Sequence, residues 1–401
     1  SEYIASYNKI NASNITNLNF GLIAGTNSGT ITNVKIINTK NTSSNYLYVY
    51  TTQSKIGTST PSARIGGFVA QNNGNITNSF IGVNASTETH SNIYIGDGTG
   101  DNGVVTSYPF RLCGSNNIAG VSYSNSGKIV STYSNAVGII NTSLLGDDNS
   151  LTAGFVAVNE SSGLISNAFV QGNNIQNFRA SEDYRIESKG NMGGFVYTNS
   201  GEIKDAYSNM VIKTNSKRSG GFVFRNTVSG TIQNAYSTAK NSVGSRAHGA
   251  FIGTNEIGEI NNEAISGALT SIYYLVVGDE YVNEYEVATP IKSTGKVEGD
   301  GAIGTSQADP FLYAGSFNGF SFSVGADLNS IWTYTNTNLG PQLISCVAND
   351  TYSNRILSST DESVDTGDGS VVVYTYNYDY NTSVGGQNTG FGDKNNPLIV
   401  R

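Results

Sequence analysis

Short apolar runs alternate with Gly- and Asn-rich turns along most of the chain, and they return in one fixed order. A small residue and an apolar pair come first, followed by Asn, Gly, Ile, a second Asn or Asp and, in several copies, an aromatic residue. The clearest copy runs from Gly154 through Asn159 and Ile165 to Phe169. Phe, Val and Ile suit half-buried strands, and Asn-x-Gly supplies the positive φ of a tight corner. Each copy therefore predicts a strand, a corner and a second strand.

Repetition of this phrase predicts a repeat architecture rather than two or three independent domains. The closest copies define a bare coil of about 27 residues, and wider spacings indicate loops added to it. A third short strand often follows a copy, as at Leu47-Tyr48-Val49-Tyr50 and Met210-Val211-Ile212. The copies begin at Gly21, Gly67, Gly120, Gly154, Gly194, Gly221 and Ala250.

We therefore predict an all-β chain folded as a parallel β-solenoid, a right-handed β-helix with about three strands per coil. A helical alternative fails because apolar residues do not recur every three to four positions. Strands of successive coils would lie about 4.8 Å apart. Equivalent asparagines would then stack into amide ladders. The residues expected to carry the repeat are Gly67, Phe68, Asn72, Ile76, Gly154, Phe155, Asn159, Ile165, Gly194, Phe195, Asn199, Ile203, Gly221, Phe222, Asn226 and Ile232.

The repeated phrase resembles the GLUG motif of bacterial surface and secreted proteins. More loosely, the chain resembles β-helical bacterial surface adhesins of the filamentous-haemagglutinin type. The resemblance covers Gly21 to Ala264, where the copies keep the same order of residues. Farther on, Phe317-Asn318-Gly319-Phe320, Trp332 and Pro341-Gln342-Leu343 are similar to the segment that often closes such arrays. The resemblance implies a secreted, extracellular protein of the cell surface, and it does not imply one particular ligand.

The pattern divides the chain into three parts. Residues 1–290 are expected to form the repeat β-solenoid, with its coils at 21–264, and residues 291–344 to close the array. Residues 345–401 are expected to form a small C-terminal β region, since apolar and polar residues alternate from Val371 to Tyr380. The last residues, 392–401, and the first, 1–7, read as one continuous segment when they are joined. We therefore expect modules arrayed or polymerised head to tail, with an excerpt cut from a longer protein as the alternative.

Composition narrows the choice of partners. Asp, Glu, Lys and Arg make up only 13% of the residues, and the formal net charge is −8. Because nucleic acids and anionic membranes require a clustered basic surface, neither is expected as a partner. No apolar run approaches the roughly 18 residues of a transmembrane helix. With 37% hydrophobic and 10% aromatic residues the chain can bury a core, so disorder is not expected.

No constellation typical of catalysis stands out, and we expect no enzymatic activity. Asp147-Asp148 and His248 resemble single residues of pectin-cleaving β-helices, but they lie far apart and lack the other catalytic partners. Neither His248 nor His90 has a carboxylate at metal-binding spacing. Asp97 and Asp101 are a candidate calcium site, because alternate oxygen ligands separated by glycines suit Ca²⁺. A plain Gly/Asp turn is the alternative, and no other cofactor is expected.

The cysteines and the insertions leave alternatives open. Cys113 and Cys346 are either two separate buried residues or the ends of a long-range disulfide. Insertions at about 84–119 and 173–193 are where a ligand or a sister filament would be gripped, since insertions gather on one edge of a solenoid. Solvated loops without a partner are the other interpretation.

Taken together, these features predict a non-enzymatic structural or adhesive module of an extracellular surface fibre or giant adhesin. Its expected partners are copies of itself, joined head to tail, and host or cell-surface glycans or proteins. One alternative is a carbohydrate-binding or carbohydrate-cleaving secreted β-helix protein, which would need a cleft with aromatics and close carboxylates. The other is a passenger of a larger secreted enzyme or toxin.

Overall fold

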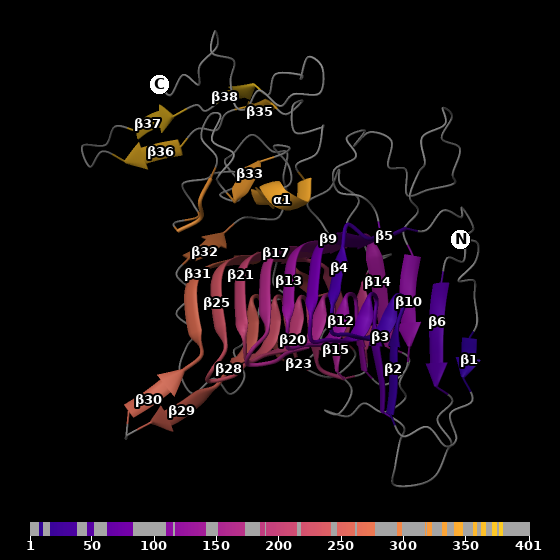
Figure 1. Cartoon of the computed structure of the whole chain (residues 1–401). Coiled ribbons are helices and arrows are strands. Elements are labelled where there is room, and N and C mark those ends of the chain that lie inside the picture. Colours follow the sequence, from indigo (N-terminus) through magenta and orange to yellow (C-terminus); the bar gives the residue numbers. More distant parts are fainter. Residues whose placement is uncertain are drawn as a thin grey trace.

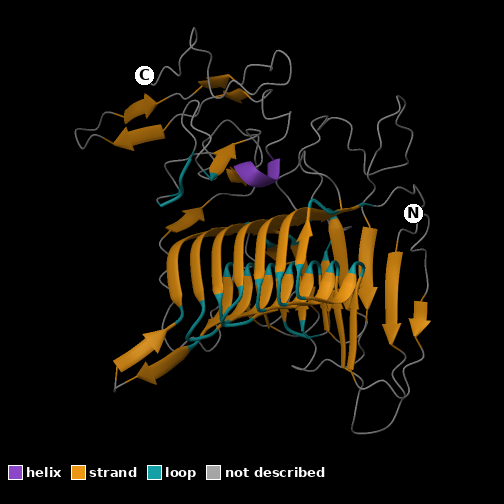
Figure 2. Cartoon of the chain, in the orientation of Figure 1, coloured by secondary structure: helices purple, strands orange, loops and turns teal. Residues whose placement is uncertain are grey.

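Nearly all regular structure in the described residues is β-strand, and most strands belong to four parallel sheets (Figure 1). Helix is confined, in these residues, to the single turn α1 (Ile344–Val347) (Figure 2). The prediction of an all-β chain built from stacked parallel strands is confirmed. The computed structural model describes residues 8–10, 17–37, 46–51, 62–82, 110–114, 117–141, 151–172, 185–188, 190–214, 218–241, 247–260, 263–276, 295–298, 317, 319–322, 331–334, 341–347, 356–358, 362–365, 371–374 and 377–379.

The four large sheets of the described residues are named A to D. Sheet A contains β1 (Asn8–Ile10), β6 (Tyr46–Thr51), β10 (Phe110–Gly114), β14 (Val137–Asn141), β18 (Ile186–Ser188), β22 (Val211–Thr214) and β26 (Lys240–Asn241). Sheet B contains β2 (Asn17–Gly21), β7 (Ser62–Gly66), β11 (Asn117–Ala119), β15 (Thr152–Ala153), β19 (Met192–Gly193), β23 (Arg218–Gly220) and β27 (Ala247–Gly249). Sheet C contains β3 (Ala24–Asn27), β8 (Val69–Asn72), β12 (Ser122–Asn125), β16 (Val156–Asn159), β20 (Val196–Asn199), β24 (Val223–Asn226) and β28 (Ile252–Asn255). Sheet D contains β4 (Thr30–Thr32), β9 (Asn75–Gly82), β13 (Lys128–Asn135), β17 (Leu164–Gln171), β21 (Glu202–Asn209), β25 (Thr231–Ser237), β31 (Ala268–Val276) and β32 (Gly295–Glu298), while β5 (Lys35–Ile36) also pairs with β9.

The chain visits sheets A, B, C and D in that order and then returns to sheet A, and we call one such passage a coil. The described coils therefore contribute four strands each, whereas three were expected. The reason lies in the glycines: Gly66 ends a strand of sheet B, and Gly67 begins the turn into sheet C. A Cβ atom on Gly67 would overlap the carbonyl oxygen of Gly120 in the next coil. The small residue and apolar pair that the sequence suggests as one strand are thus the junction of two strands, one of sheet B and one of sheet C, which meet at a glycine corner.

Corner lengths differ systematically around the described coils. The turn from sheet B to sheet C is two residues long in each coil, as between β7 and β8. The turn from sheet C to sheet D stays at two to four residues until the last coil, where the antiparallel hairpin of β29 (Ile257–Ile260) and β30 (Glu263–Ser266) is inserted. The long connections, including 83–109 between β9 and β10, flank sheet A. Insertions therefore gather around one sheet, as the repeat pattern predicted.

Strand register differs by one residue from the sequence alignment in the first copy. Gly21 pairs with Gly66 rather than taking the place of Gly67, and Ala24 pairs with Val69. The repeat is recognised mainly by its asparagines and glycines. The sequence alone therefore did not reveal that the apolar pair Leu22-Ile23 lies one position earlier in the coil than Phe68-Val69. Beyond the corner the copies coincide, since Asn27 pairs with Asn72.

One apolar core receives side chains from all four sheets. Leu112 comes from sheet A, Ile65 from sheet B, Val69 from sheet C and Ile76 from sheet D, and all four are fully buried. Each such side chain stabilises the fold by about 1.5–3 kcal/mol relative to exposure. The aromatic and isoleucine positions of the repeat lie in this core, namely Phe68, Phe155, Phe195, Phe222, Ile76, Ile165, Ile203 and Ile232.

The remaining strands follow the repeats. β32 extends sheet D past residue 290 by pairing in parallel with β31. β33 (Trp332–Tyr334) and β34 (Pro341–Leu343) form an antiparallel pair that leads into α1. Farther on, β35 (Ile356–Ser358) pairs with β38 (Asn377–Asp379), and β36 (Glu362–Asp365) pairs with β37 (Val371–Tyr374). The alternating stretch from Val371 to Tyr380 therefore supplies two short strands of antiparallel pairs rather than one long strand.

Candidate functional site

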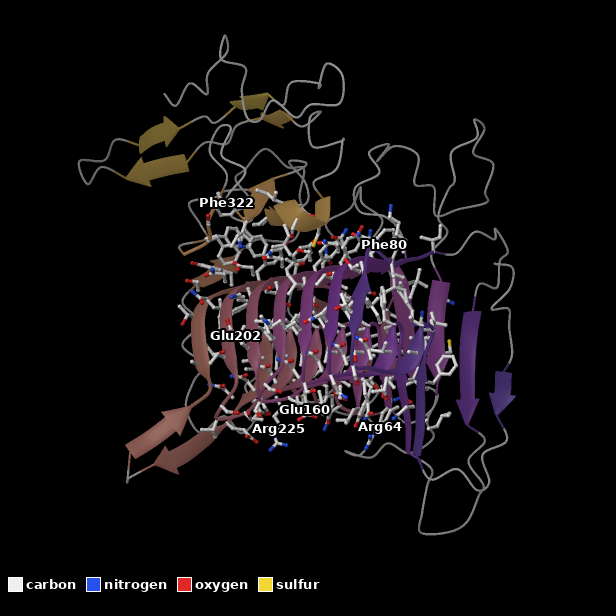
Figure 3. All side chains as sticks on the ribbon, viewed as in Figure 1. Arg64, Phe80, Glu160, Glu202, Arg225 and Phe322 are labelled. Atoms are coloured by element: carbon white, nitrogen blue, oxygen red, sulfur yellow. The ribbon has the colours of Figure 1, made fainter. Side chains whose placement is uncertain are left out.

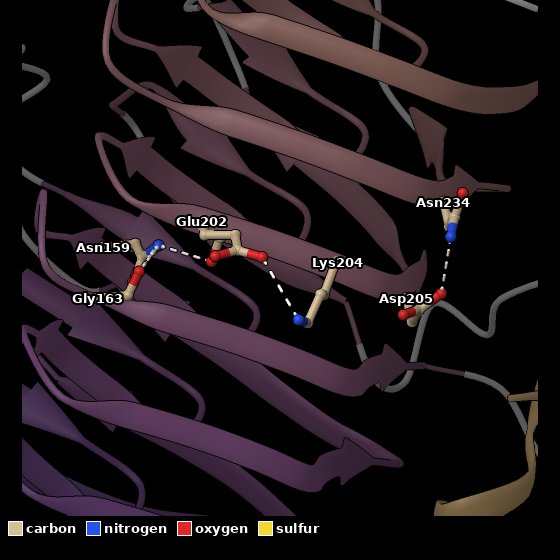
Figure 4. A network of polar contacts seen from close by, with 6 residues as sticks. All are labelled: Asn159, Gly163, Glu202, Lys204, Asp205 and Asn234. Carbon is tan, nitrogen blue, oxygen red and sulfur yellow. Dashed lines mark hydrogen bonds and ion pairs between the residues drawn. The ribbon is translucent and has the colours of Figure 1, made fainter.

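A continuous ladder of side-chain amides runs along the ends of the sheet C strands. Each Nδ2 atom donates to the Oδ1 atom of the next asparagine over 2.8 or 2.9 Å. Asn159 shows the full pattern, because its Nδ2 also lies 3.3 Å from the carbonyl oxygen of Gly163 and 3.4 Å from that of Glu202 (Figure 4). The predicted amide ladder is confirmed. Its members are Asn27, Asn72, Asn125, Asn159, Asn199, Asn226 and Asn255.

An inner aromatic column lies in the core at the other ends of the sheet C strands, since Phe155 directly precedes β16 and Asn159 ends it. Phe155, Phe195, Phe222 and Phe251 stack in succession, with ring centroids 4.6 to 4.7 Å apart. This spacing matches the distance between neighbouring strands, so parallel in-register pairing brings equal rings face to face. The repeat thus stacks both its polar and its apolar residues on copies of themselves.

A second set of stacked rings, the outer aromatic column, lies on the other face of sheet D. Within β17, Ala168 and Val170 belong to the core, whereas Phe169 between them belongs to a separate cluster. Just before these residues the chain adopts a left-handed conformation, with φ of 49° at Asn167 and 51° at Asp205. Asn and Asp tolerate this conformation best, which explains their place in the repeat. The column contains Phe80, Tyr133, Phe169, Tyr207, Tyr236 and Tyr273, and Phe80 is labelled in Figure 3.

The closing segment, by which we mean the described residues from 317 to 347, covers the outer aromatic column. Tyr236 donates its hydroxyl hydrogen to the carbonyl oxygen of Pro341 over 2.6 Å. The Tyr207 hydroxyl lies 3.0 Å from Oε1 of Gln342. Both tyrosine side chains are about 1% exposed. Because burial removes water from the phenolate form, it raises the pKa of both hydroxyls well above the ordinary value, so both stay protonated hydrogen-bond donors.

Rings of the closing segment complete this contact. Phe317 meets Tyr273 edge to face at 4.9 Å, and Trp332 stacks on Phe320 at 4.5 Å. Trp332 also lies tilted over Tyr236 with the ring centroids 5.9 Å apart, and its side chain is fully buried. The single tryptophan of the chain is therefore the centre of the contact between the closing segment and sheet D.

Asp205 joins the closing segment to the repeat. Its Oδ1 atom accepts a hydrogen bond from Nδ2 of Asn234 at 3.1 Å (Figure 4). The same atom accepts a hydrogen bond from Nε1 of Trp332, also at 3.1 Å. Burial raises the pKa of the Asp205 carboxyl above its ordinary value, and the two donors, together with Lys204, offset part of this increase. The carboxyl is thus held in a polar but poorly hydrated position between the two parts.

Both cysteines are free and buried, so the disulfide alternative is wrong. Cys113 lies in β10 of sheet A, whereas Cys346 lies in α1, where its Sγ atom contacts the carbonyl oxygen of Asn167 at 3.2 Å on the sheet D side. Burial raises the pKa of each thiol to about 12. Neither thiol therefore has the thiolate character of a nucleophile or metal ligand.

Charged groups of the described residues form isolated pairs rather than one site. Arg225 pairs with Glu256, and Arg185 pairs with Glu187 at 2.6 Å. Arg64 lies over the ring of Tyr123, 5.4 Å from its centroid. Paired surface charges of this kind contribute little to stability.

Several predicted residues fall outside the described part of the chain. The calcium candidates Asp97 and Asp101 lie there, as do Asp147, Asp148 and His90, most of insertion 84–119 and residues 173–184 of the second insertion. His248 lies in β27, in sheet B. Within the described residues, no three His, Cys, Asp or Glu side chains are placed to hold a metal ion.

Sequence reasoning missed the outer aromatic column as a docking surface. The aromatic residue that ends each phrase was visible, from Phe80 to Tyr236. The closing segment could not be recognised as the partner of these rings, because the hydrogen bonds that join it to sheet D connect residues 105 to 179 positions apart. The one available signal was the similarity of Phe317 to Leu343 to an array-closing segment.

Comparison with known proteins finds no match, since no family model, no curated protein and no solved structure matches the chain. Among the described residues, none of the helices has the length and apolar character needed to cross a membrane. Fold and geometry therefore define the class of molecule as a stack of parallel β-strands with an added closing segment.

Proposed function

We propose that the chain is a non-enzymatic structural or adhesive module of an extracellular surface fibre, built as a right-handed parallel β-solenoid and arrayed head to tail. The observation that carries this proposal is the unbroken asparagine ladder. It links successive coils over their whole described length through side-chain hydrogen bonds of 2.8 or 2.9 Å. Such a ladder stiffens the stack along its axis, which is the direction in which a fibre bears tension.

The resemblance of the repeat to the GLUG motif supports the same proposal. It leads us to place the protein at the bacterial cell surface or outside the cell, with copies of itself and surface glycans or proteins as partners. The low charge content and the gathering of insertions around sheet A fit a rod that displays loops along one side.

Ring orientation weighs against the alternative of a carbohydrate-binding or carbohydrate-cleaving β-helix. Sugars stack on exposed ring faces, but rings of both aromatic columns cover one another's faces; Phe169 and Tyr207 are 4.6 Å apart with 3° between their planes. Within the described residues Ile23 is the one large hydrophobic side chain that is well exposed, at 41%. Among the side chains that the structure describes there is therefore no platform of exposed aromatic rings.

Electron microscopy of the purified protein at physiological salt, with and without a chelator, tests the proposal. We expect long filaments of uniform width whose axial repeat is close to the length of one module. Disassembly by the chelator would add calcium to the proposal, while filaments unchanged by it would leave calcium out. Isolated short rods under all conditions would contradict head-to-tail assembly.

A further inference from the structure

The asparagine ladder has a direction, and within the described residues it is open at its C-terminal end. Inside the stack each Nδ2 group donates to the next ladder asparagine and also lies near at least one backbone carbonyl oxygen, as in Asn226, which lies 3.2 Å from Gly230 O and 2.9 Å from Asn255 Oδ1. Asn255 makes the equivalent bond within its own coil, to Gly267 O over 3.1 Å. No ladder asparagine follows it in the described part of the chain, so its second N–H hydrogen has no ladder acceptor there.

The N-terminal end of the ladder shows the opposite character. Asn27 donates its Nδ2 hydrogen to Asn72 over 2.8 Å, while its Oδ1 atom accepts the backbone N–H of Gly29 over 3.1 Å. An amide oxygen has two lone pairs, and within the described residues no asparagine of an earlier coil donates to the second. One end of the ladder thus offers a donor, and the other end offers an acceptor.

The strand edges at the two ends share their columns in sheets B and C, whereas β1 and β26 of sheet A fall on different columns. In the described sheets A, B and C, the first strands are β1, β2 and β3, and the last are β26, β27 and β28. In sheet D, β32 pairs with the second half of β31, which leaves the first half, 268–270, as the edge. In its own chain β4 pairs with the matching half of β9, so β4 of an incoming copy has this edge of β31 as its counterpart. β5 of the incoming copy would instead meet the part of β31 with which β32 already pairs. The hairpin β29–β30 leaves the coil at its corner (Figure 1).

The first coil also presents apolar side chains that inner coils bury. Ile23 is 41% exposed, whereas Phe68 in the next coil is fully buried. Leu22 and Ile31 are only partly buried against the core. At the other end Phe251 closes the inner aromatic column. Within the described residues, the first coil is therefore exposed like an inner coil without a neighbour on its outer side.

We propose that the N-terminal end of one copy docks on the C-terminal end of a second copy. Asn27 Oδ1 of the incoming copy accepts the second N–H hydrogen of Asn255, Ile23 packs against Phe251, and β3 pairs in parallel with β28. This inference rests on the proposed head-to-tail array, and it names the surfaces and the register that would build it. In sheet C the junction then repeats the contact that joins β3 to β8 within the chain, whereas in sheet D β32 keeps the place on β31 that β5 takes on β9.

Disulfide trapping at the outer row of sheet C tests the register. Thr26 occupies this row in β3 and Thr254 in β28, because Thr26 pairs with Gln71 and Thr254 with Arg225 in the same column. In the proposed junction the two threonines come from different copies and lie about 4.8 Å apart. That distance is within the Cα separation of roughly 4.4–6.8 Å that a disulfide spans. The double variant Thr26→Cys/Thr254→Cys should therefore form multimers under mild oxidation.

The matched control is Thr26→Cys/Arg225→Cys. Arg225 lies in the same row but one coil farther from the junction, about twice the strand spacing from the incoming Thr26, which no disulfide spans. Both variants should keep the circular-dichroism spectrum of the wild type, since all three side chains lie on the outer row. The native thiols, Cys113 and Cys346, are buried in both.

Non-reducing gels of the oxidised proteins give four outcomes. Multimers of Thr26→Cys/Thr254→Cys alone support the junction, whereas equal multimers of both variants would show random collision and overturn it. No multimers of either variant, with wild-type filaments in the microscope, would overturn this junction while the proposed array stands. No multimers and no wild-type filaments would overturn the junction and the array together.

Discussion

At the scale of single residues, buried asparagine is tolerated because both halves of its amide are matched by neighbours of the same kind. Asn159 is fully buried, accepts from Asn125 over 2.9 Å and donates to Asn199 over 2.8 Å. An isolated buried amide would be costly, but a periodic row of amides leaves none unpaired except at its ends. The repeat therefore uses a polar residue as a core component.

Replacing one member of the ladder should expose this dependence. Asn159→Ala leaves the Asn125 donor and the Asn199 acceptor buried without their partner, at about 1–3 kcal/mol for each. We expect the free energy of unfolding, measured by urea titration, to fall by the sum of the two. Asn75→Ala, at an exposed position of β9, serves as the control and should change it by less than about 0.5 kcal/mol. Equal effects of the two variants would show that the ladder bonds contribute nothing.

Asp205 makes a different prediction, on pH. Because burial raises its pKa in the folded chain, its contribution to stability is complete below the ordinary Asp value and declines as the pH rises through the raised value. Asp205→Asn keeps an Oδ1 acceptor for Trp332, suits the left-handed backbone and has no proton to lose. The free energy of unfolding of each protein is measured through the fluorescence of Trp332. We expect the variant's value minus the wild-type value to increase from pH 4 to pH 7. Parallel stability curves over that range would contradict the assignment.

At the scale of elements, the closing segment is held to the repeat by one aromatic centre. Phe320→Ala removes the ring on which Trp332 stacks and opens a cavity above Tyr273, which lies 5.5 Å from Phe320. Such a substitution costs about 3–5 kcal/mol when the ring is buried. We expect red-shifted Trp332 fluorescence with an unchanged far-ultraviolet circular dichroism signal. Phe322→Ala, at a half-buried position of the same segment, is the control and should shift the emission less.

The strands show how much of this fold the sequence predicts. Asn, Gly and Ile recur in a fixed order, as at Asn72, Gly74 and Ile76, and the Gly keeps its place two residues before the Ile, so the corner from sheet C to sheet D and its amide ladder were predictable. Sheet B was not, because strands such as Thr152–Ala153 are too short to show a period of two. The closing segment could be suspected from its resemblance but not placed, since nothing local in Pro341 or Gln342 identifies Tyr207 and Tyr236 as partners. Local periodicity predicts the coils, whereas long-range docking leaves no periodic trace.

At the scale of the whole molecule, the closing segment alters how the coils depend on one another. In a simple solenoid each coil contacts only its neighbours, so the ends can fray independently. Here Cys346 contacts Asn167 in β17, and Phe317 contacts Tyr273 in β31. Since α1 also contacts β13, one segment thus spans five successive strands of sheet D, β13, β17, β21, β25 and β31. Opening the last of these coils must disturb the segment and, through it, the contact with β17.

Hydrogen exchange should reveal this coupling. In the wild type we expect the amides of β17, β21, β25 and β31 to exchange through one common opening with a single free energy. In Phe320→Ala, which loosens the segment, we expect protection to fall most in β31 and least in β17, because only nearest-neighbour contacts then remain. Amides of β8, in sheet C of the coil that precedes the one with β13, provide the internal reference. A gradient along the four strands already present in the wild type would mean that the segment covers the coils without coupling them, and their cooperativity would then have to come from the asparagine ladder and the inner aromatic column.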